Sequence, residues 1–514
     1  MTPASLNIFA SRLNAVCDEM GLVLRNAAFS PNIRDRLDFS CAVFDANGEL
    51  CAQAAHIPVH LGSMAFAMRD IVGGMRWRPG DQVVLNDPFL GGTHLPDVTL
   101  IAPFFTAGEL LGFVANRAHH ADIGASSPGS MPVSATLYEE GIVLPPSYLV
   151  RSDRVVDEVH SDIVARTRNS TESAGDFAAQ IAANRAGVAR ITDLIAGGGG
   201  HQFVTGVGEL NAYAERLARR ALEAIPVGVY RFADLLDDDG QGNSAIPIVV
   251  TLQVEHEQVT VDFAGTAGQV AGNVNCPLAV AAAAVYYVFR CLMPPQTPAC
   301  AGAFRPLHLR APAGCLVNAR KPAAVAAGNV ETSTRIVDTV LGALATALPD
   351  VVPAASHGSM NNVAIGSSLA GKSWDYYETI GGGMGAGRDG GGLAGIQTHM
   401  TNTLNTPIEV LESRFPLRIR QYAIRRGSGG LGRRPGGDGL VREFEFTAPA
   451  HYTLLTERRS HAPWGLAGGG AGMVGVNSLN GQRLPAKCDG EVAAGDRLCI
   501  ETPGGGGFGE PQTG

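Results

Sequence analysis

Four residues that can bind a metal flank a predicted β-hairpin, which the chain forms between residues 98 and 118. Both arms are rich in β-branched and aromatic residues, and an Ala-Gly-Glu turn separates them. His94 and Asp97 precede the hairpin, and His119 and Asp122 follow it. Because the two ends of an antiparallel hairpin lie side by side, we expect two imidazoles and two carboxylates to converge there. Zinc, manganese and iron take such ligands, so the sequence predicts a metal or catalytic site.

The alternative is that these residues have only structural roles. A single histidine or aspartate at the end of a strand more often caps a turn or faces solvent than binds a metal. The spacing is also less specific than that of a helical H-E-x-x-H motif. The clustering of the four residues across one hairpin is what favours a metal site.

The composition is that of a globular enzyme. A length of 514 residues predicts two to four domains or one large interleaved fold. The formal charge is −9 and no basic run occurs, which argues against binding to nucleic acid or to an anionic membrane. Nine scattered cysteines without a C-x-x-C pair indicate reduced thiols in a cytoplasmic protein. The N-terminus does not read as a signal peptide, and the longest apolar run, residues 278–289, is shorter than the ~20 residues that span a bilayer.

Hydrophobic periodicity predicts six helices, at residues 5–27, 63–72, 174–195, 208–224, 279–292 and 331–348. Alternating segments predict further hairpins that turn at Asn47-Gly48 and His256-Glu257. Residues 138–160 look irregular, and the chain beyond about residue 357 is β-rich. Because regular β-α-β alternation is absent, we predict an α+β fold, a large mixed fold with a β-rich, glycine-rich C-terminal half and several packed helices.

We also predict a division into three regions. The first, residues 1–170, is an N-terminal α+β region with the candidate metal site. The second, residues 171–350, holds a helical hairpin, a β-hairpin and further helices. The third, residues 351–514, is rich in glycine and in β-structure.

The apparent nucleotide-binding motifs lack the structure that such motifs need. Gly366, Gly371 and Lys372-Ser373 satisfy the Walker A pattern, but an aromatic, β-prone segment follows instead of a helix. Two G-x-G-x-x-G matches, at 385–390 and 427–432, also lack a following helix. We therefore predict that this chain does not bind a nucleotide by itself. His357 and His399 have no identifiable catalytic partners and are interpreted as structural.

Long segments spread over nearly the whole chain resemble one family. They include RLDFSCAVFD, HIPVHLGSM, NDPFLGGTHLPDV, HHADIGASSPGSMP, GNVETSTRIVDTV, SHGSMNNV, YYETIGGGMGAGRDG and THMTNTLNTPIEVLE. Together they are similar to the hydantoinase B/oxoprolinase family, the B-type component of ATP-dependent hydantoinases and 5-oxoprolinases, which is related to subunits of ketone carboxylases.

The resemblance implies a ligand set and a partner. The family's metal lies on an H-x-x-D motif and a following histidine, which here are His94, Asp97 and His119, and Asp38 of the R-x-D-F-S motif is a further candidate. ATP would be bound by a separate A-type subunit of actin-like ATPase character, so the resemblance implies a hetero-oligomer. The sequence from His119 to Asp122, HHAD, is closer to the hydantoinase and oxoprolinase side than to the carboxylases.

We therefore predict an ATP-dependent hydrolase that opens a lactam or imide ring. The A-type partner activates the carbonyl with ATP, and water bound to a divalent transition metal (Zn, Mn or Fe) attacks it. His120 and Asp122 are the predicted catalytic residues, which take a proton or orient a ligand imidazole. The glycine-rich segment 381–392 is expected to offer N–H groups to the developing charge. The alternatives are a subunit of an ATP-dependent ketone carboxylase, a non-catalytic partner of the A-type subunit, and a self-contained ATPase that uses Lys372.

Overall fold

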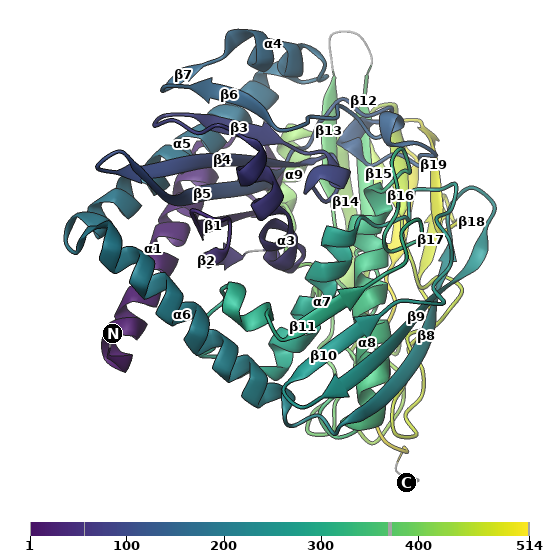
Figure 1. The fold of residues 1–514 in the computed structure, drawn as a ribbon. Coiled ribbons are helices and arrows are strands. Elements are labelled where there is room, and N and C mark those ends of the chain that lie inside the picture. Colours follow the sequence, from purple (N-terminus) through teal and green to yellow (C-terminus); the bar gives the residue numbers. More distant parts are fainter. Residues whose placement is uncertain (1, 56, 369–372, 512–514) are drawn as a thin grey trace.

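Helices and four β-sheets make up the computed structural model, which describes residues 2–55, 57–368 and 373–511. The predicted α+β class is confirmed. Figure 1 shows the N-terminal sheet on one side of the molecule and the glycine-rich C-terminal half on the other, with helices α7 and α8 between them.

The N-terminal sheet carries the candidate site. Its seven strands lie in the order β2-β1-β5-β4-β3-β6-β7. Their bounds are β1 Phe39–Asp45, β2 Leu50–Ala55, β3 Gln82–Leu85, β4 Asp97–Thr106, β5 Glu109–His119, β6 Ser147–Arg151 and β7 Arg154–Val155. Helices α1 (Pro3–Ala27) and α5 (Ser170–Ala196) pack on one face, and α3 (Pro58–Gly74) lies on the other. The short helices α2 (Pro31–Arg34) and α4 (Asp157–Ala165) complete this part.

Strands β4 and β5 form the predicted hairpin. Ala107 and Gly108, at its turn, both have positive φ, at 51° and 84°. Glycine adopts such angles without steric cost, and this allows the tight reversal. The register pairs Asp97 directly with His119, so the two ends of the hairpin meet as the sequence predicts. The hairpin predicted at Asn47-Gly48 is also present, as β1 and β2.

The rest of the chain builds three more sheets. The second has the order β11-β10-β9-β8 (β8 Gly228–Asp238, β9 Ser244–Glu255, β10 Gln258–Asp262, β11 Leu307–Arg310) and packs on α8 (Ser333–Ala347). Helix α7 (Leu278–Leu292) lies between α8 and α3. The third sheet is β13-β12-β16-β19 (β12 Asn362–Ser367, β13 Trp374–Glu378, β16 Ala450–Leu455, β19 Lys487–Val492). The fourth is β14-β15-β20-β17-β18 (β14 Leu417–Arg425, β15 Gly439–Phe446, β17 Val476–Leu479, β18 Gln482–Leu484, β20 Arg497–Glu501), and α9 (Ile408–Arg414) precedes β14.

Some predicted boundaries were wrong. Residues 138–160 are not irregular, because they hold β6, β7 and the start of α4. Strand β6 pairs with β3, more than 60 residues earlier, so its local sequence gives little sign of it. Helix α6 (Gly199–Leu222) starts nine residues before its predicted start, and α3 starts five residues early, at Pro58. The weak helix propensity of the glycines in α6 is offset by packing of Phe203 against Phe9 and Phe104.

The glycine-rich segments pack closely against one another. The N–H groups of Gly383 and Ala386 donate to the carbonyls of Pro503 and Gly506, and Gly437 N–H donates to Met384. A Cβ on Gly383 would lie 1.9 Å from the carbonyl oxygen of Gly437, so only glycine permits this approach. The expectation that residues 381–392 offer free N–H groups to a ligand is therefore wrong for these positions.

The Walker A match does not precede a helix. Gly366 lies within β12, and β13 begins at Trp374, directly after Ser373. Gly371 and Lys372 lie outside the described residues. The strand after the match agrees with the prediction that this is not a phosphate-binding loop. Among the described residues, no helix is long and apolar enough to cross a membrane.

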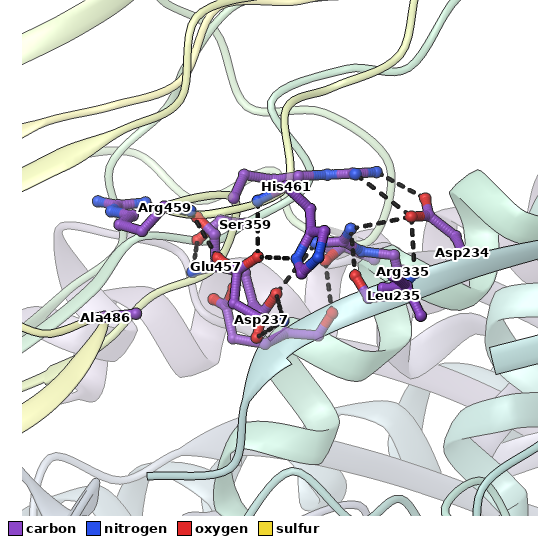
Figure 2. Close-up of polar contacts among 12 residues, drawn as sticks. Asp234, Leu235, Asp237, Arg335, Ser359, Glu457, Arg459, His461 and Ala486 are labelled. Carbon is purple, nitrogen blue, oxygen red and sulfur yellow. Dashed lines mark hydrogen bonds and ion pairs between the residues drawn. The ribbon is translucent and has the colours of Figure 1, made fainter. Parts of the chain in front are cut away.

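A buried charge network, centred on Asp237 and Glu457, joins the middle and C-terminal parts (Figure 2). Glu457 accepts hydrogen bonds from Arg335 of α8 at 3.1 Å and from Lys487 of β19 at 2.7 Å. Asp237 of β8 accepts from the backbone N–H groups of residues 459–461 and lies 2.8 Å from His461 Nδ1. One hydrophobic cluster likewise includes side chains from Leu6 to Leu455. The division at residues 170 and 350 stays a prediction.

Candidate metal centre

Three of the predicted site residues converge at the end of the β4–β5 hairpin. Asp97 begins β4, His119 ends β5, and His94 lies in the loop before β4. One ligand atom from each lies within 4.8 Å of those of the other two. All three side chains are buried, with exposed fractions of 0% for His94, 1% for Asp97 and 2% for His119. The hairpin register therefore brings an N, N, O donor set together in the interior.

The two carboxylate oxygens of Asp97 have different surroundings. Oδ2 accepts hydrogen bonds from Thr93 Oγ1 at 2.5 Å and Asn329 Nδ2 at 3.2 Å, and His60 Nε2 lies 3.3 Å away. Oδ1 faces the two imidazoles, with His94 Nε2 at 3.2 Å and His119 Nδ1 at 3.3 Å, but makes no hydrogen bond. Neighbouring side chains thus hold one oxygen, and the other is free to bind a cation.

The electrostatics favour an ionised Asp97 beside a neutral His119. Burial by itself raises the pKa of Asp97, but His94 and His60 outweigh it and hold this pKa well below its usual value. Burial lowers the pKa of His119, more than Asp97 raises it. Burial also acts to lower the pKa of His94, yet the Asp97 carboxylate beside it raises this pKa above the ordinary value.

The residues present fit a divalent transition cation. His94 Nε2, Asp97 Oδ1 and His119 Nε2 are buried atoms without hydrogen-bond partners, which is uncommon for polar groups in protein interiors. A cavity of about 20 Å³ lies among these side chains, and Asp38 and His60 also line it. A space of this size holds one ion or one water molecule, since roughly 10–15 Å³ is the minimum for a water. Imidazole nitrogen and carboxylate oxygen suit zinc, manganese or iron.

Asp38 lies at the cavity but already has a cationic partner. Its Oδ2 is 3.7 Å from Arg36 Nη2, and its backbone carbonyl accepts the N–H of His119 at 3.0 Å. The first contact partly balances its charge, and the second fixes the end of β5. Asp38 is therefore close enough to influence the centre electrostatically, and its role as a ligand stays a prediction.

His120 and Asp122 do not line the cavity. Because consecutive strand residues point to opposite faces, His120 faces α5, where its Nε2 lies 2.9 Å from Gln180 Oε1. Asp122 accepts hydrogen bonds from the backbone N–H groups of Gly124, Arg168 and Asn169. These contacts hold the chain after β5 against the start of α5, and the predicted catalytic roles of both residues stay predictions.

Several residues that complete the centre were not predicted from the sequence. His60 stands in the HIPVHLGSM segment, whose only signal was its likeness to the family. Asn329 belongs to a π-helical turn, Gly328–Thr332, which opens α8, and such turns are frequent at functional sites. Thr93 gave no signal beyond its position next to His94. Tyr377, whose ring stacks on His119, could be found only by knowing the packing of β13.

The fold and the centre define a class of protein with a buried candidate metal site of two histidines and an aspartate at the end of an antiparallel hairpin. The sequence profile of the hydantoinase B/oxoprolinase family matches residues 2–511. The chain is 39% identical to 5-oxoprolinase 1 of Arabidopsis thaliana, and the match covers 98% of this chain and 41% of that relative. It is 32% identical to a putative B-type component of a D-/L-hydantoinase from a Pseudomonas species, over 99% of this chain and 90% of that one.

A solved structure agrees with these relatives. The ATP-dependent caprolactamase of Pseudomonas jessenii superposes with a TM-score of 0.91 at 26% identity, covering 99% of this chain and 91% of that one. The chain belongs to the hydantoinase B/oxoprolinase family, which includes ATP-dependent enzymes that act on cyclic amides.

Proposed function

We propose that this chain is the B-type component of an ATP-dependent cyclic-amide hydrolase of the hydantoinase/5-oxoprolinase type. The observation that carries the proposal is the buried Asp97 carboxylate, which presents one unpartnered oxygen to two imidazoles. The substrate class, a lactam or imide, is supported by relatives named as a 5-oxoprolinase, a hydantoinase component and a caprolactamase.

In this proposal His94, Asp97 and His119 hold a divalent transition cation. A cation of this kind lowers the pKa of a coordinated water and so supplies a nucleophile at neutral pH. Because Thr93 and Asn329 occupy Oδ2, Asp97 would bind through Oδ1 alone. Asp38, whose Oδ2 lies 3.7 Å from Arg36 Nη2, is the further candidate ligand.

His120 and Asp122 are proposed to orient the centre. Their contacts are structural in kind, since His120 is bonded to Gln180 and Asp122 to three backbone N–H groups. Both residues lie within three positions of His119. They can therefore fix the direction in which the end of β5 presents the His119 ring.

The proposal assigns ATP to a separate A-type subunit. Phosphorylation of the amide carbonyl by that partner would make a resonance-stabilised ring reactive enough for attack by water. The active protein would then be a hetero-oligomer. The hydantoinase relative, which is named as one component of an enzyme and of which this chain covers 90%, supports this arrangement.

The test is a ring-opening assay of the chain purified together with a co-expressed A-type subunit. With ATP, 5-oxoproline, hydantoin and caprolactam are supplied separately, and we expect ATP-dependent opening of at least one ring. Asp97→Asn should abolish ring opening, while Asp489→Asn, at a half-exposed position on β19, should leave it unchanged. Full activity of Asp97→Asn would instead identify a non-catalytic partner of the A-type subunit. Carboxylation of acetone with bicarbonate, without opening of any ring, would identify the carboxylase alternative.

A further inference from the structure

The His119 ring is stacked on a tyrosine from the C-terminal half of the chain. The ring of Tyr377, on β13, lies nearly parallel to the imidazole, with 4.7 Å between centroids and 8° between planes. Tyr377 is 1% exposed and lines the cavity of the candidate metal centre. The three proposed ligands come from residues 94–119. Tyr377 therefore contacts the centre from a position more than 250 residues further along the chain.

The Tyr377 ring is itself fixed in place. Its hydroxyl donates to Asn362 Oδ1 at 2.7 Å, and Asn362 Nδ2 donates to Glu331 Oε1 at 2.6 Å and to the carbonyl of Leu455 at 2.7 Å. The guanidinium of Arg36 lies 4.8 Å from the centroid of the same ring. Contacts at the ring face and at the hydroxyl thus leave Tyr377 little freedom to move.

His119 has few contacts of its own that could fix its orientation. Its Nδ1 lies 3.3 Å from Asp97 Oδ1, its Nε2 has no partner, and the His94 ring meets its edge at 5.1 Å between centroids. Rotation of the imidazole about its Cβ–Cγ bond would turn the nitrogens away from Asp97. A parallel aromatic neighbour opposes this rotation, because tilting the imidazole would drive its edge into the tyrosine ring.

We infer that Tyr377 is a positioning residue that holds the imidazole plane of His119 in the orientation needed to bind the cation. The inference rests on the proposed function, since it requires that His119 bind a cation. None of the three proposed ligands, His94, Asp97 and His119, comes from the C-terminal half of the chain. Through Tyr377, this half would nevertheless fix the geometry of the centre.

The neighbouring residue offers a matched control. Tyr376 is also 1% exposed and stands on the same strand, but its side chain points to the opposite face. There its hydroxyl donates to Glu378, and its ring packs on Phe415 with centroids 5.2 Å apart. Loss of either tyrosine removes a buried aromatic ring from β13, and only Tyr377 contacts a proposed ligand.

The experiment is a titration of the full chain with Co²⁺, followed by visible absorption, together with Zn²⁺ competition. Tyr377→Leu should weaken the Kd for Co²⁺ by about 10–100-fold, the range for residues that orient a metal ligand, and change the absorption spectrum. Tyr377→Phe keeps the ring, so its spectrum should match the parent's and its Kd should weaken by about fivefold at most, the value of one hydrogen bond. Tyr376→Leu should leave both the Kd and the spectrum unchanged.

The outcomes separate this inference from the proposed function. A parent chain that binds no Co²⁺ or Zn²⁺ would overturn both. A parent that binds the cation, with the same Kd and spectrum in Tyr377→Leu, would overturn the positioning role alone. If Tyr377→Leu does not fold, Tyr377→Phe is the deciding variant, because it keeps the stacked ring. A loss of Co²⁺ binding in Tyr377→Phe as complete as in His119→Ala would show that the ring does not orient His119.

Discussion

Asp97 and Asp237 are both buried aspartates beside a histidine, yet their surroundings differ in one respect. Asp237 lies 2.8 Å from His461 Nδ1, and both of its oxygens accept backbone N–H groups of residues 459–461. Asp97 has three polar neighbours at Oδ2 and no hydrogen bond at Oδ1. A carboxylate that is fully satisfied stabilises the fold, whereas one whose free oxygen lies between two imidazoles is a candidate metal ligand.

The same contrast extends to the residues around each aspartate. Near Asp237, the carboxylate of Glu457 pairs with Lys487 and Arg335, and Figure 2 shows the charged side chains of this network meeting between β8, α8 and the segment after β16. Near Asp97 the neighbours are two imidazoles with unpartnered nitrogens. Both aspartates are buried beside a histidine, so the free Oδ1 of Asp97 and its two imidazole neighbours are what distinguish the candidate site from the structural network.

The largest effect on stability is expected from Glu457→Ala. Removal of this carboxylate takes away the nearest counterion of the buried Lys487 and Arg335, which keep the more distant Asp238 and Asp234 at 3.8 and 3.4 Å. Loss of one partner of a buried ion pair costs about 3–5 kcal/mol of unfolding free energy. Denaturant unfolding measures the change, with Glu491→Ala, at an exposed side chain on β19, as the control. Cation content per folded molecule should be unchanged. A loss below about 1 kcal/mol, the range of surface pairs, would show that the network does not hold the two parts together.

A smaller but more specific effect is expected from Thr93→Val. This change keeps the side-chain shape and removes the hydroxyl that donates to Asp97 Oδ2. The Kd for a divalent cation should weaken by about 10–100-fold, because Asp97 is no longer held with Oδ1 toward the imidazoles. Calorimetric titration with Zn²⁺ measures it. The matched control is Thr456→Val, which removes a buried hydroxyl that donates to Ala486 in the network. Equal effects of the two variants on the Kd would show that the hydroxyl beside Asp97 matters no more for cation binding than one in the charge network.

The last expected effect is a change in pH dependence in Asp375→Asn. Asp375, like Asp97, is a buried aspartate with an unpartnered oxygen, but it has no hydrogen bond or ion pair to a histidine among the described residues. Burial, with a contribution from Asp122, raises its pKa from 3.8 to about 7, so we expect this carboxyl group to carry a proton below about pH 7. A raised carboxyl pKa stabilises the fold at low pH, and this contribution is lost as the pH rises from about 4 to about 7.

The stability of the parent relative to Asp375→Asn should therefore fall as the pH rises from about 5 to about 7, and then level off. Unfolding free energies of both proteins across this range measure the difference. A difference that stays constant with pH would mean that Asp375 is ionised in the folded protein.

Local pattern predicted the elements that carry the site. The alternation around the turn at Ala107-Gly108 predicted β4 and β5, and their pairing placed Asp97 opposite His119. Contacts over long distances in sequence could not be predicted in this way. Asn329 reaches Asp97 across 232 positions, and Tyr377 reaches His119 only because β13 packs beside the end of β5.

The glycine-rich segments show the opposite error. Their sequence suggests free N–H groups, but those of Gly383 and Ala386 donate to carbonyls more than 100 residues later. A glycine run indicates that backbone approaches something closely, and only the tertiary structure shows that its partner is more backbone. The motif HHAD shows a related limit, because sequence alone does not separate its two histidines. His119 ends β5 and lies 3.3 Å from Asp97, whereas His120, the next residue, lies 2.9 Å from Gln180 of α5.

The most direct test of the proposed metal centre is the metal content of the purified chain and of its His119→Ala variant, by elemental analysis. We expect about one equivalent of zinc, manganese or iron in the parent and almost none in the variant, because three protein ligands are the usual number at a catalytic site. Circular dichroism should show the same fold for both. An absence of metal from the parent, or equal content in parent and variant, would contradict the assignment of His94, Asp97 and His119 as a metal centre.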